Sequence, residues 1–148
     1  MHRSSGPARS ARVPPTPTVW RARPRCLSCG LCCVGTEMVL TPSDLRRLEL
    51  LGFRREEFAV YDGRFYRLRN VGGRCFFHRG GRCAVYEHRP IGCSMYPIVV
   101  DPETLEVRVD GYCPLAGETR PEELERARRI APRVIGELRR GYAPRERL

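Results

Sequence analysis

The residues best able to do chemistry are cysteines, and half of the eight in the chain lie in one short stretch. That stretch reads Cys-Leu-Ser-Cys-Gly-Leu-Cys-Cys and contains Cys26, Cys29, Cys32 and Cys33. The other cysteines follow singly, at Cys75, Cys83, Cys93 and Cys113. Thiolates are soft ligands that suit zinc, copper(I) and iron–sulfur clusters. A bound metal is therefore the simplest explanation for so many thiols in a small chain.

The spacing within the opening stretch is typical of a metal-binding turn. Two overlapping Cys-x-x-Cys spacings, Cys26 to Cys29 and Cys29 to Cys32, let two sulfurs reach one ion within a tight turn. Gly30 suits such a turn because glycine tolerates a positive φ and a close approach of backbone to metal. Cys32 and Cys33 are adjacent, so we expect their side chains to diverge toward two sites or two faces of one cluster.

The identity of the metal stays open between iron–sulfur and zinc. The repeated two-residue spacing matches the start of a ferredoxin-type run, which places a [4Fe–4S] cluster a little ahead. The match then fails at Cys33, although Cys113-Pro114 offers the Cys-Pro that ends such a run. Two zinc ions would use all eight cysteines with equal economy. His78 and His88 lie near cysteines and are alternative ligands, although exposed loop histidines explain them more simply.

The net charge of +10 is concentrated at the two ends of the chain. Residues 1–25 hold six arginines and no acidic residue, and residues 139–148 hold four arginines and one glutamate. The remaining residues, 26–138, carry a charge of only +1. Proteins that recognise nucleic acid carry their basic residues on the folded part. We therefore expect an unidentified protein partner and not nucleic acid.

Apolar patterning gives no sign of a membrane or export signal. No apolar run reaches the length that a membrane span requires, and the basic N-terminus lacks the apolar core of a secretory signal. We therefore expect a cytoplasmic protein without membrane association. Thiols stay reduced in the cytoplasm, so the cysteine cluster indicates metal or redox chemistry and not a disulfide framework.

Three helical segments are predicted around the cysteines. Thr41-Pro42-Ser43-Asp44 predicts a helix start with Thr41 as the N-cap, Gly52 ends that helix, and residues 54–59 add another turn. A short helical turn between Pro90 and Pro97 is expected to hold Cys93. The last helix is expected from about Thr119, with Glu122 completing a capping box and Pro132 interrupting the helix.

Short strands are predicted between the helices. Residues 38–40 and 64–69 fit single strands. A hairpin is expected to pair 75–77 with 83–86 around the turn 78–82, and would then carry one cysteine on each arm. A second hairpin is expected to pair 98–100 with 105–109. The sequence shows no evident internal repeat.

These elements predict a single small α+β domain, with short β-hairpins and two peripheral helices organised around cysteine-ligated metal sites. Residues 21–138 would form this domain. Residues 1–20 are rich in arginine, serine and proline and are expected to be a disordered basic tail, with Trp20 as the first residue able to dock. Residues 139–148 would form a basic C-terminal tail.

The cysteines and their neighbours resemble the CxxCxxCC family, also called YkgJ-type cysteine-cluster proteins. The resemblance covers about residues 26–114 and includes Val85-Tyr86-x-x-Arg89-Pro90 and Cys93-x-x-Tyr96-Pro97. Members are described as zinc- or iron-chelating domains, so the resemblance implies metal binding by all eight cysteines. A similar cysteine domain occurs in flagellin lysine N-methylases, where an iron–sulfur cluster is implicated, but this chain is much shorter than such enzymes.

Three functions follow from this reading. The first is metal or iron–sulfur binding with a redox, scaffold or accessory role. The second is a part in cluster-assisted protein modification, and the third is a zinc module that binds nucleic acid through the basic tails. The sequence has no Gly-rich phosphate loop, Ser–His–Asp constellation or HExxH motif, and offers no catalytic residue, which favours a binding protein over an enzyme.

Tyr86 and Arg89 are expected to donate hydrogen bonds around the site.

Overall fold

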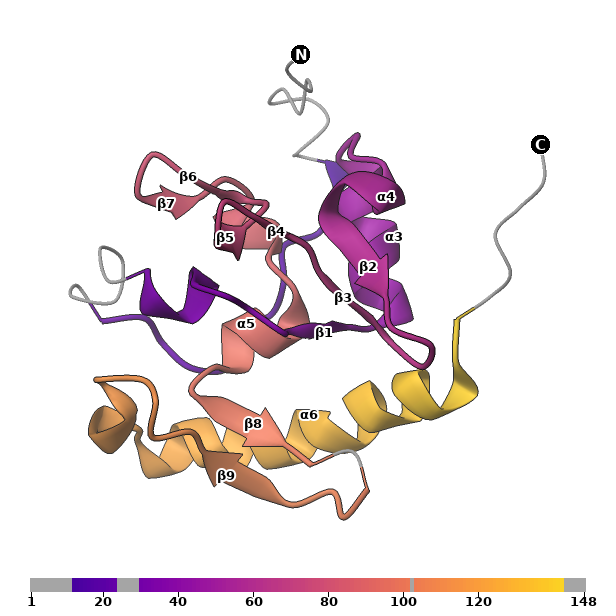
Figure 1. Cartoon of the computed structure of the whole chain (residues 1–148). Coiled ribbons are helices and arrows are strands. Elements are labelled where there is room, and N and C mark those ends of the chain that lie inside the picture. Colours follow the sequence, from indigo (N-terminus) through magenta and orange to yellow (C-terminus); the bar gives the residue numbers. More distant parts are fainter. Residues whose placement is uncertain (1–11, 24–29, 102, 143–148) are drawn as a thin grey trace.

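The computed structural model describes residues 12–23, 30–101 and 103–142 (Figure 1). It confirms the predicted mixed α+β class, with short helices, one long helix and several small antiparallel sheets. The helices are α3 (Pro42–Leu50), α4 (Arg55–Phe58), α5 (Ile91–Met95) and α6 (Pro121–Arg140). Single 3-10 turns are η1 (Leu31–Cys33), η2 (Tyr86–His88) and η3 (Ala116–Glu118).

One layer contains a three-stranded antiparallel sheet in the order β1-β3-β2, next to α3 and α4 (Figure 1). Its strands are β1 (Val39–Leu40), β2 (Ala59–Tyr61) and β3 (Tyr66–Leu68). Phe58 and Phe77 are fully buried in the core between sheet and helices. Their rings lie 5.5 Å apart, and Phe53 meets Phe77 edge-on at 5.1 Å. Aromatic burial therefore supplies much of the packing in this layer.

Helix α3 begins and ends as the sequence predicts. The hydroxyl of Thr41 accepts a hydrogen bond from the Asp44 amide at 3.0 Å, and the Asp44 carboxylate accepts one from the Thr41 amide at 2.9 Å. This reciprocal pair satisfies two amides that have no partner within the helix. At the other end, Gly52 adopts a φ of 109°, a conformation that favours glycine and stops the helix.

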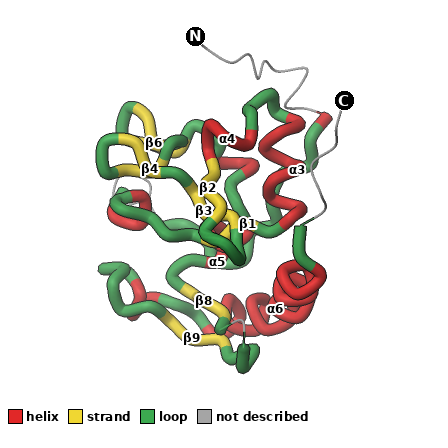
Figure 2. The backbone as a smooth tube through the Cα atoms, turned by 45° about the vertical axis from the view of Figure 1, so that its right-hand side comes forward, coloured by secondary structure: helices red, strands yellow, loops and turns green. Residues whose placement is uncertain are grey.

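The other layer is the hairpin of β8 (Ile98–Val100) and β9 (Val107–Val109), which packs against α6 (Figure 2). The prediction of this hairpin is confirmed. Helix α6 differs from its prediction in two ways. It begins at Pro121 with Glu123 in the capping position, because proline is preferred at the first helical position. It also continues through Pro132, which is exposed, while Ala127, Ala131 and Ile135 keep the opposite face buried.

Residues 12–23 pack against both layers, although composition predicts a disordered tail as far as residue 20. Val13, Val19 and Trp20 are buried, so the docking of Trp20 is confirmed. The Trp20 indole donates to the Thr119 hydroxyl at 3.1 Å, and its amide donates to the Ser94 carbonyl at 3.0 Å. Apolar side chains between the prolines therefore anchor this segment, and residues 1–11 lie outside the described part of the chain.

None of the helices in the described part of the chain combines the length and apolarity that crossing a membrane requires.

A buried ion pair fastens the N-terminal segment to the start of α6. The Glu123 carboxylate is fully buried and accepts hydrogen bonds from the Arg23 guanidinium and the Arg21 amide, each at 2.8 Å. It also accepts one from the Arg120 amide at 2.8 Å. Burial alone would raise the pKa of Glu123, but the hydrogen bonds from Arg23 and these two amides outweigh burial and lower the pKa.

This lowered pKa makes the stability of the fold depend on pH. The unfolded chain takes up a proton near the ordinary glutamate pKa of 4.5, whereas the folded carboxylate stays charged to lower pH. The stabilisation is therefore complete above that value and is lost as the pH falls toward the folded pKa. We expect Glu123→Gln to lower the free energy of unfolding at neutral pH by roughly 3 kcal/mol and to flatten its decline below pH ~5.

Urea unfolding at a series of pH values measures this effect. The matched control is Glu122→Gln, which changes the neighbouring, exposed glutamate. Equal pH profiles for the two variants would show that the Glu123 charge contributes nothing to the fold.

Candidate metal centre

Two consecutive hairpins carry Cys75 and Cys83. Strand β4 (Asn70–Val71) pairs with β5 (Arg74–Cys75), and β6 (His78–Arg79) pairs with β7 (Arg82–Cys83). The prediction of one hairpin with a cysteine on each arm is therefore wrong, because each cysteine ends a hairpin of its own. The cause is the glycine pairs at 72–73 and 80–81, whose positive φ angles form two-residue turns.

The two hairpins are copies of one eight-residue unit that the sequence analysis missed. Gly-Gly-Arg-Cys occurs at 72–75 and again at 80–83. The Phe76 amide donates to the Arg69 carbonyl at 2.8 Å, and eight residues later the Ala84 amide donates to the Phe77 carbonyl at 2.7 Å. The repeated four-letter motif is the signal that could have revealed the unit, and it places two thiols in equivalent positions.

The end of the opening cysteine stretch lies directly against the first hairpin. Val34 forms a β-bridge with Arg74, and the Gly35 amide donates to the Gly73 carbonyl at 2.8 Å. The Asn70 side chain exchanges two hydrogen bonds with the backbone of Thr36, each at 3.0 Å. These contacts fix Cys32 and Cys33, which lie in η1, next to the hairpin that carries Cys75.

Gly30 brings the same stretch against the second hairpin. Its φ is 67°, and a Cβ atom there would lie 3.1 Å from Cε1 of His78. A side chain at this position would therefore be strained and would press on the imidazole. The expected positive φ at Gly30 is confirmed, whereas Cys26 and Cys29 lie outside the described residues.

Helix α5 carries Cys93 into the middle of the molecule, between the two layers (Figures 1 and 2). The predicted helical turn between Pro90 and Pro97 is confirmed. The buried Asp44 carboxylate accepts a hydrogen bond from the Ile91 amide at 2.9 Å and thereby caps α5 as well as α3. Gly92 allows close packing, because a Cβ there would lie only 2.3 Å from Sδ of Met38.

Electrostatics indicate that four of the described thiols share one neighbourhood. Burial raises the pKa of Cys93 well above its ordinary value, and the thiols of Cys83, Cys75 and Cys32 raise it further. Burial also raises the pKa of Cys75 to about 11, again with contributions from Cys83 and Cys32. Thiols that oppose one another's ionisation are stabilised as thiolates by a cation among them. The thiols of Cys32, Cys75, Cys83 and Cys93 are therefore close enough to affect one another's charge, and their donor type suits a soft metal, although no three of them lie close enough together here to form a metal site.

Cys32 and Cys33 do not diverge as expected. A hydrogen bond with the Cys33 thiol is the largest cause that raises the pKa of Cys32. The adjacent thiols of η1 are therefore close enough to interact. This arrangement places Cys33 beside the four-thiol group.

Two groups around these thiols favour their ionised forms. The Phe77 amide donates to Sγ of Cys75 at 3.4 Å, and the positive charge of Arg89 lowers the pKa of Cys32 and of Cys83. Arg89 is nearly buried, donates to the Tyr86 carbonyl at 2.6 Å and lies over the Tyr86 ring at 4.0 Å. The expectation that Arg89 donates a hydrogen bond near the site is therefore confirmed, and the backbone and ring of Tyr86 position Arg89.

The two histidines of this region have different surroundings. Nε2 of His88 is within 2.8 Å of the Val13 carbonyl, so His88 anchors the N-terminal segment. Nδ1 of His78 is buried and has no hydrogen-bond partner among the described residues. Since buried polar atoms are nearly always paired, His78 remains a candidate ligand.

Cys113 is partly buried against the apolar cluster that contains Trp20 and Leu115. The Tyr96 hydroxyl donates to the Asp110 carboxylate at 2.5 Å. Burial and Asp110 raise the pKa of Tyr96, and Cys113 and Cys32 both add to the effect. Cys113 and Cys32 therefore both lie near Tyr96. Within residues 12–23, 30–101 and 103–142, no three cysteine, histidine or acidic side chains lie close enough together to form a metal site.

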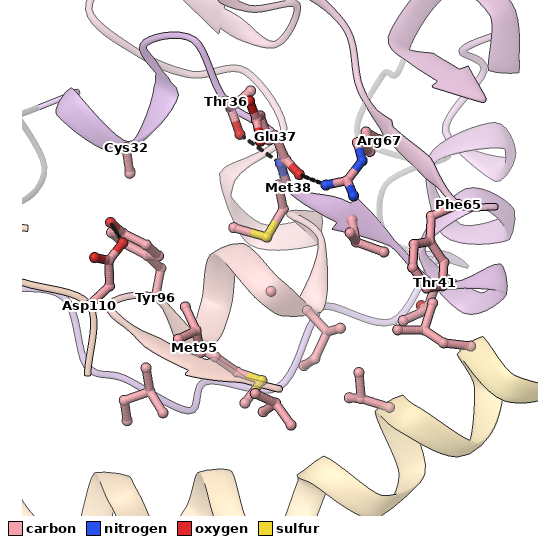
Figure 3. Close-up of a pocket in the computed structure, with 18 of the residues that line it drawn as sticks. Cys32, Thr36, Glu37, Met38, Thr41, Phe65, Arg67, Met95, Tyr96 and Asp110 are labelled. Atoms are coloured by element: carbon pink, nitrogen blue, oxygen red, sulfur yellow. Dashed lines mark hydrogen bonds between the residues drawn. The ribbon is translucent and has the colours of Figure 1, made fainter. Parts of the chain in front are cut away.

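A cavity of about 570 Å³ extends from Cys32 between the two layers (Figure 3). Apolar side chains line most of it, with Met38 and Met95 on its walls. The Tyr96–Asp110 pair lies on the same side as Cys32, and Arg67 lies on the opposite side (Figure 3). The cavity therefore joins an apolar space to the thiol group.

Comparison with known proteins identifies one family. The sequence model of that family, described as “CxxCxxCC: Putative zinc- or iron-chelating domain”, matches residues 25–119. This range covers more than half of the chain and contains all eight cysteines. Neither curated proteins nor solved structures gave a match. The chain belongs to the CxxCxxCC family of zinc- or iron-chelating domains.

Proposed function

We propose that the chain binds a [4Fe–4S] cluster through its cysteines, with zinc as the alternative metal. The ligands would come from Cys26, Cys29, Cys32, Cys33, Cys75, Cys83, Cys93 and Cys113. The observation that carries this proposal is that Cys32, Cys75, Cys83 and Cys93 come from four separate segments and yet influence one another's ionisation. Zinc or iron chelation by the family supports the same conclusion.

Iron is preferred to zinc because of how the thiols are grouped. Cys26, Cys29 and Cys32 follow the two-residue spacing of a cluster-binding run. A cluster spreads its ligands over several iron atoms, so it accommodates adjacent thiols such as Cys32 and Cys33 more readily than one tetrahedral ion does. The charge of Arg89 and the Phe77 amide would stabilise the sulfur ligands in their ionised form.

A bound cluster would supply one-electron redox chemistry, whereas zinc would supply structural support. We propose a redox, scaffold or accessory role beside a protein partner. The metal would also link the short hairpins to η1 and α5, because strands of two residues bury too little surface to be stable alone.

A second candidate function is participation in cluster-assisted protein modification. The observation that favours it is the cavity beside Cys32, which is large enough for a side chain or small cofactor. The Tyr96 hydroxyl, which donates to the Asp110 carboxylate, lies at that cavity. Protection of the cavity residue Met38 from chemical oxidation by a bound small molecule would support this candidate.

Cys83 is predicted to be a metal ligand. We expect Cys83→Ser to weaken metal binding by more than about 100-fold, the upper end of losses for removing only a partner of a ligand. The matched control is Ala84→Ser, which introduces the same side chain at the next, exposed position. Metal content after desalting against a competing chelator measures the difference. Equal retention by both variants would remove Cys83 from the ligand set.

Removal of the metal is predicted to lower the thermal stability of the domain. A ligand at 1,000 times its Kd adds about 4 kcal/mol of stability. Each 1 kcal/mol moves the unfolding midpoint of a domain of this size by about 2–4 °C. We therefore expect chelation to lower the midpoint in circular dichroism by about 10 °C. The Cys83→Ser variant should not respond to the chelator, and an unchanged wild-type midpoint would contradict a metal that supports the fold.

A further inference from the structure

The near-neutral middle of the chain is the sum of two oppositely charged regions. Residues 63–86 contain six arginines and no acidic residue, a formal charge of +6. Residues 87–125 contain nine acidic residues and three arginines, a formal charge of −6. The positive region includes both cysteine-bearing hairpins, whereas the negative region includes the β8–β9 hairpin and the start of α6. The near-neutral sum therefore conceals a basic segment that contains both cysteine-bearing hairpins.

The arginines of the hairpins are not neutralised within the described chain. Arg64 pairs with Glu103 at 3.8 Å, and Arg67 pairs with Asp62 at 2.6 Å. The other four are exposed and have no ion pair among the described residues; they are Arg69, Arg74, Arg79 and Arg82. We call these four the hairpin arginines.

Two hairpin arginines are placed where folding alone would not favour them. Arg79 and Arg82 are direct cross-strand partners in the β6–β7 hairpin. Like charges in such a pair destabilise a hairpin. The Arg79 guanidinium lies over the Phe76 ring at 4.8 Å, which fixes its position without neutralising its charge. A negatively charged partner would relieve this repulsion.

The hairpin arginines also lie immediately behind the thiols. Arg74 precedes Cys75, and Arg82 precedes Cys83. Successive side chains of a strand point to opposite faces, so Arg82 lies on the outer face when Cys83 faces inward. The Arg74 guanidinium instead reaches the opening stretch, where a Cβ at Gly30 would lie 3.7 Å from it. A partner on this outer face would therefore be separated from the thiol group by a single layer of backbone.

We propose that the outer face of the two hairpins binds the acidic surface of a protein partner next to the metal centre. This inference rests on the proposed function, because it names the partner chemistry of that centre. A protein partner fits better than nucleic acid. Duplex DNA carries one charge per about 1.7 Å of its axis and would extend well beyond two short hairpins that present four arginines without an ion pair among the described residues.

Binding of a fluorescent polyglutamate peptide to the full-length, metal-loaded chain tests the proposal. We expect R79E/R82E to weaken binding by about tenfold or more, because two attractive contacts become repulsive. The matched control is R128E/R133E, which makes the same charge change at two exposed positions of α6. The control should keep most of the affinity, and added salt should remove the difference between the two variants.

Three outcomes would overturn the proposal. Equal losses in both double variants would mean that only net charge matters. A larger effect of R79E/R82E on a DNA duplex than on the peptide would assign the surface to nucleic acid. Loss of metal in R79E/R82E would show that the arginines serve the centre itself. A chain that takes up neither iron nor zinc but still binds the peptide through the hairpins would refute the metal function and leave the acidic-partner surface supported.

Discussion

A single buried carboxylate, that of Asp44, joins the start of α3 to the start of α5. It accepts hydrogen bonds from the amides of Thr41 and Ile91 and pairs with Arg47 at 2.9 Å. Removing one partner from such a buried group leaves the others unpaired, which typically costs 3–5 kcal/mol, or about half of the stability of a small domain. Because α5 carries Cys93 between the layers, this carboxylate also sets where the fourth thiol of the group lies.

The positions of Cys75 and Cys83 depend on two very short hairpins. Each hairpin uses two glycines to turn and two residues per strand to deliver a cysteine, so little apolar surface holds it in place. The opening stretch is tied to the first hairpin by Asn70 and by the bridge at Val34. Such a design suits a domain in which a metal contributes folding energy. It also leaves the outer faces of the hairpins free to carry charge.

Local signals predicted what local physics determines, and tertiary contacts decided the rest. The capping residues of α3, the prolines around Cys93 and the alternation of β8 and β9 have short-range causes, so their predictions were confirmed. The prediction of a single cysteine-bearing hairpin was wrong, because strands of two residues are too short to show an alternation of apolar and polar residues. The packing of Val13 and Val19 depends on distant partners such as Arg126, which donates to the Val19 carbonyl at 3.1 Å. For the centre, the spacing and the family resemblance predicted metal binding by all eight cysteines, but the electrostatic effect of Cys75 on Cys93 depends on the fold.

The most direct test of the account is anaerobic purification followed by the visible absorption spectrum, with iron, zinc and acid-labile sulfide measured on the same sample. A [4Fe–4S] cluster predicts a brown protein with iron and sulfide in equal amounts, and bleaching on oxidation or chelation. A colourless protein that contains zinc and no sulfide would contradict the proposed [4Fe–4S] cluster but would still support metal binding by the cysteines. A protein without either metal, although all eight thiols are reduced, would contradict the central claim.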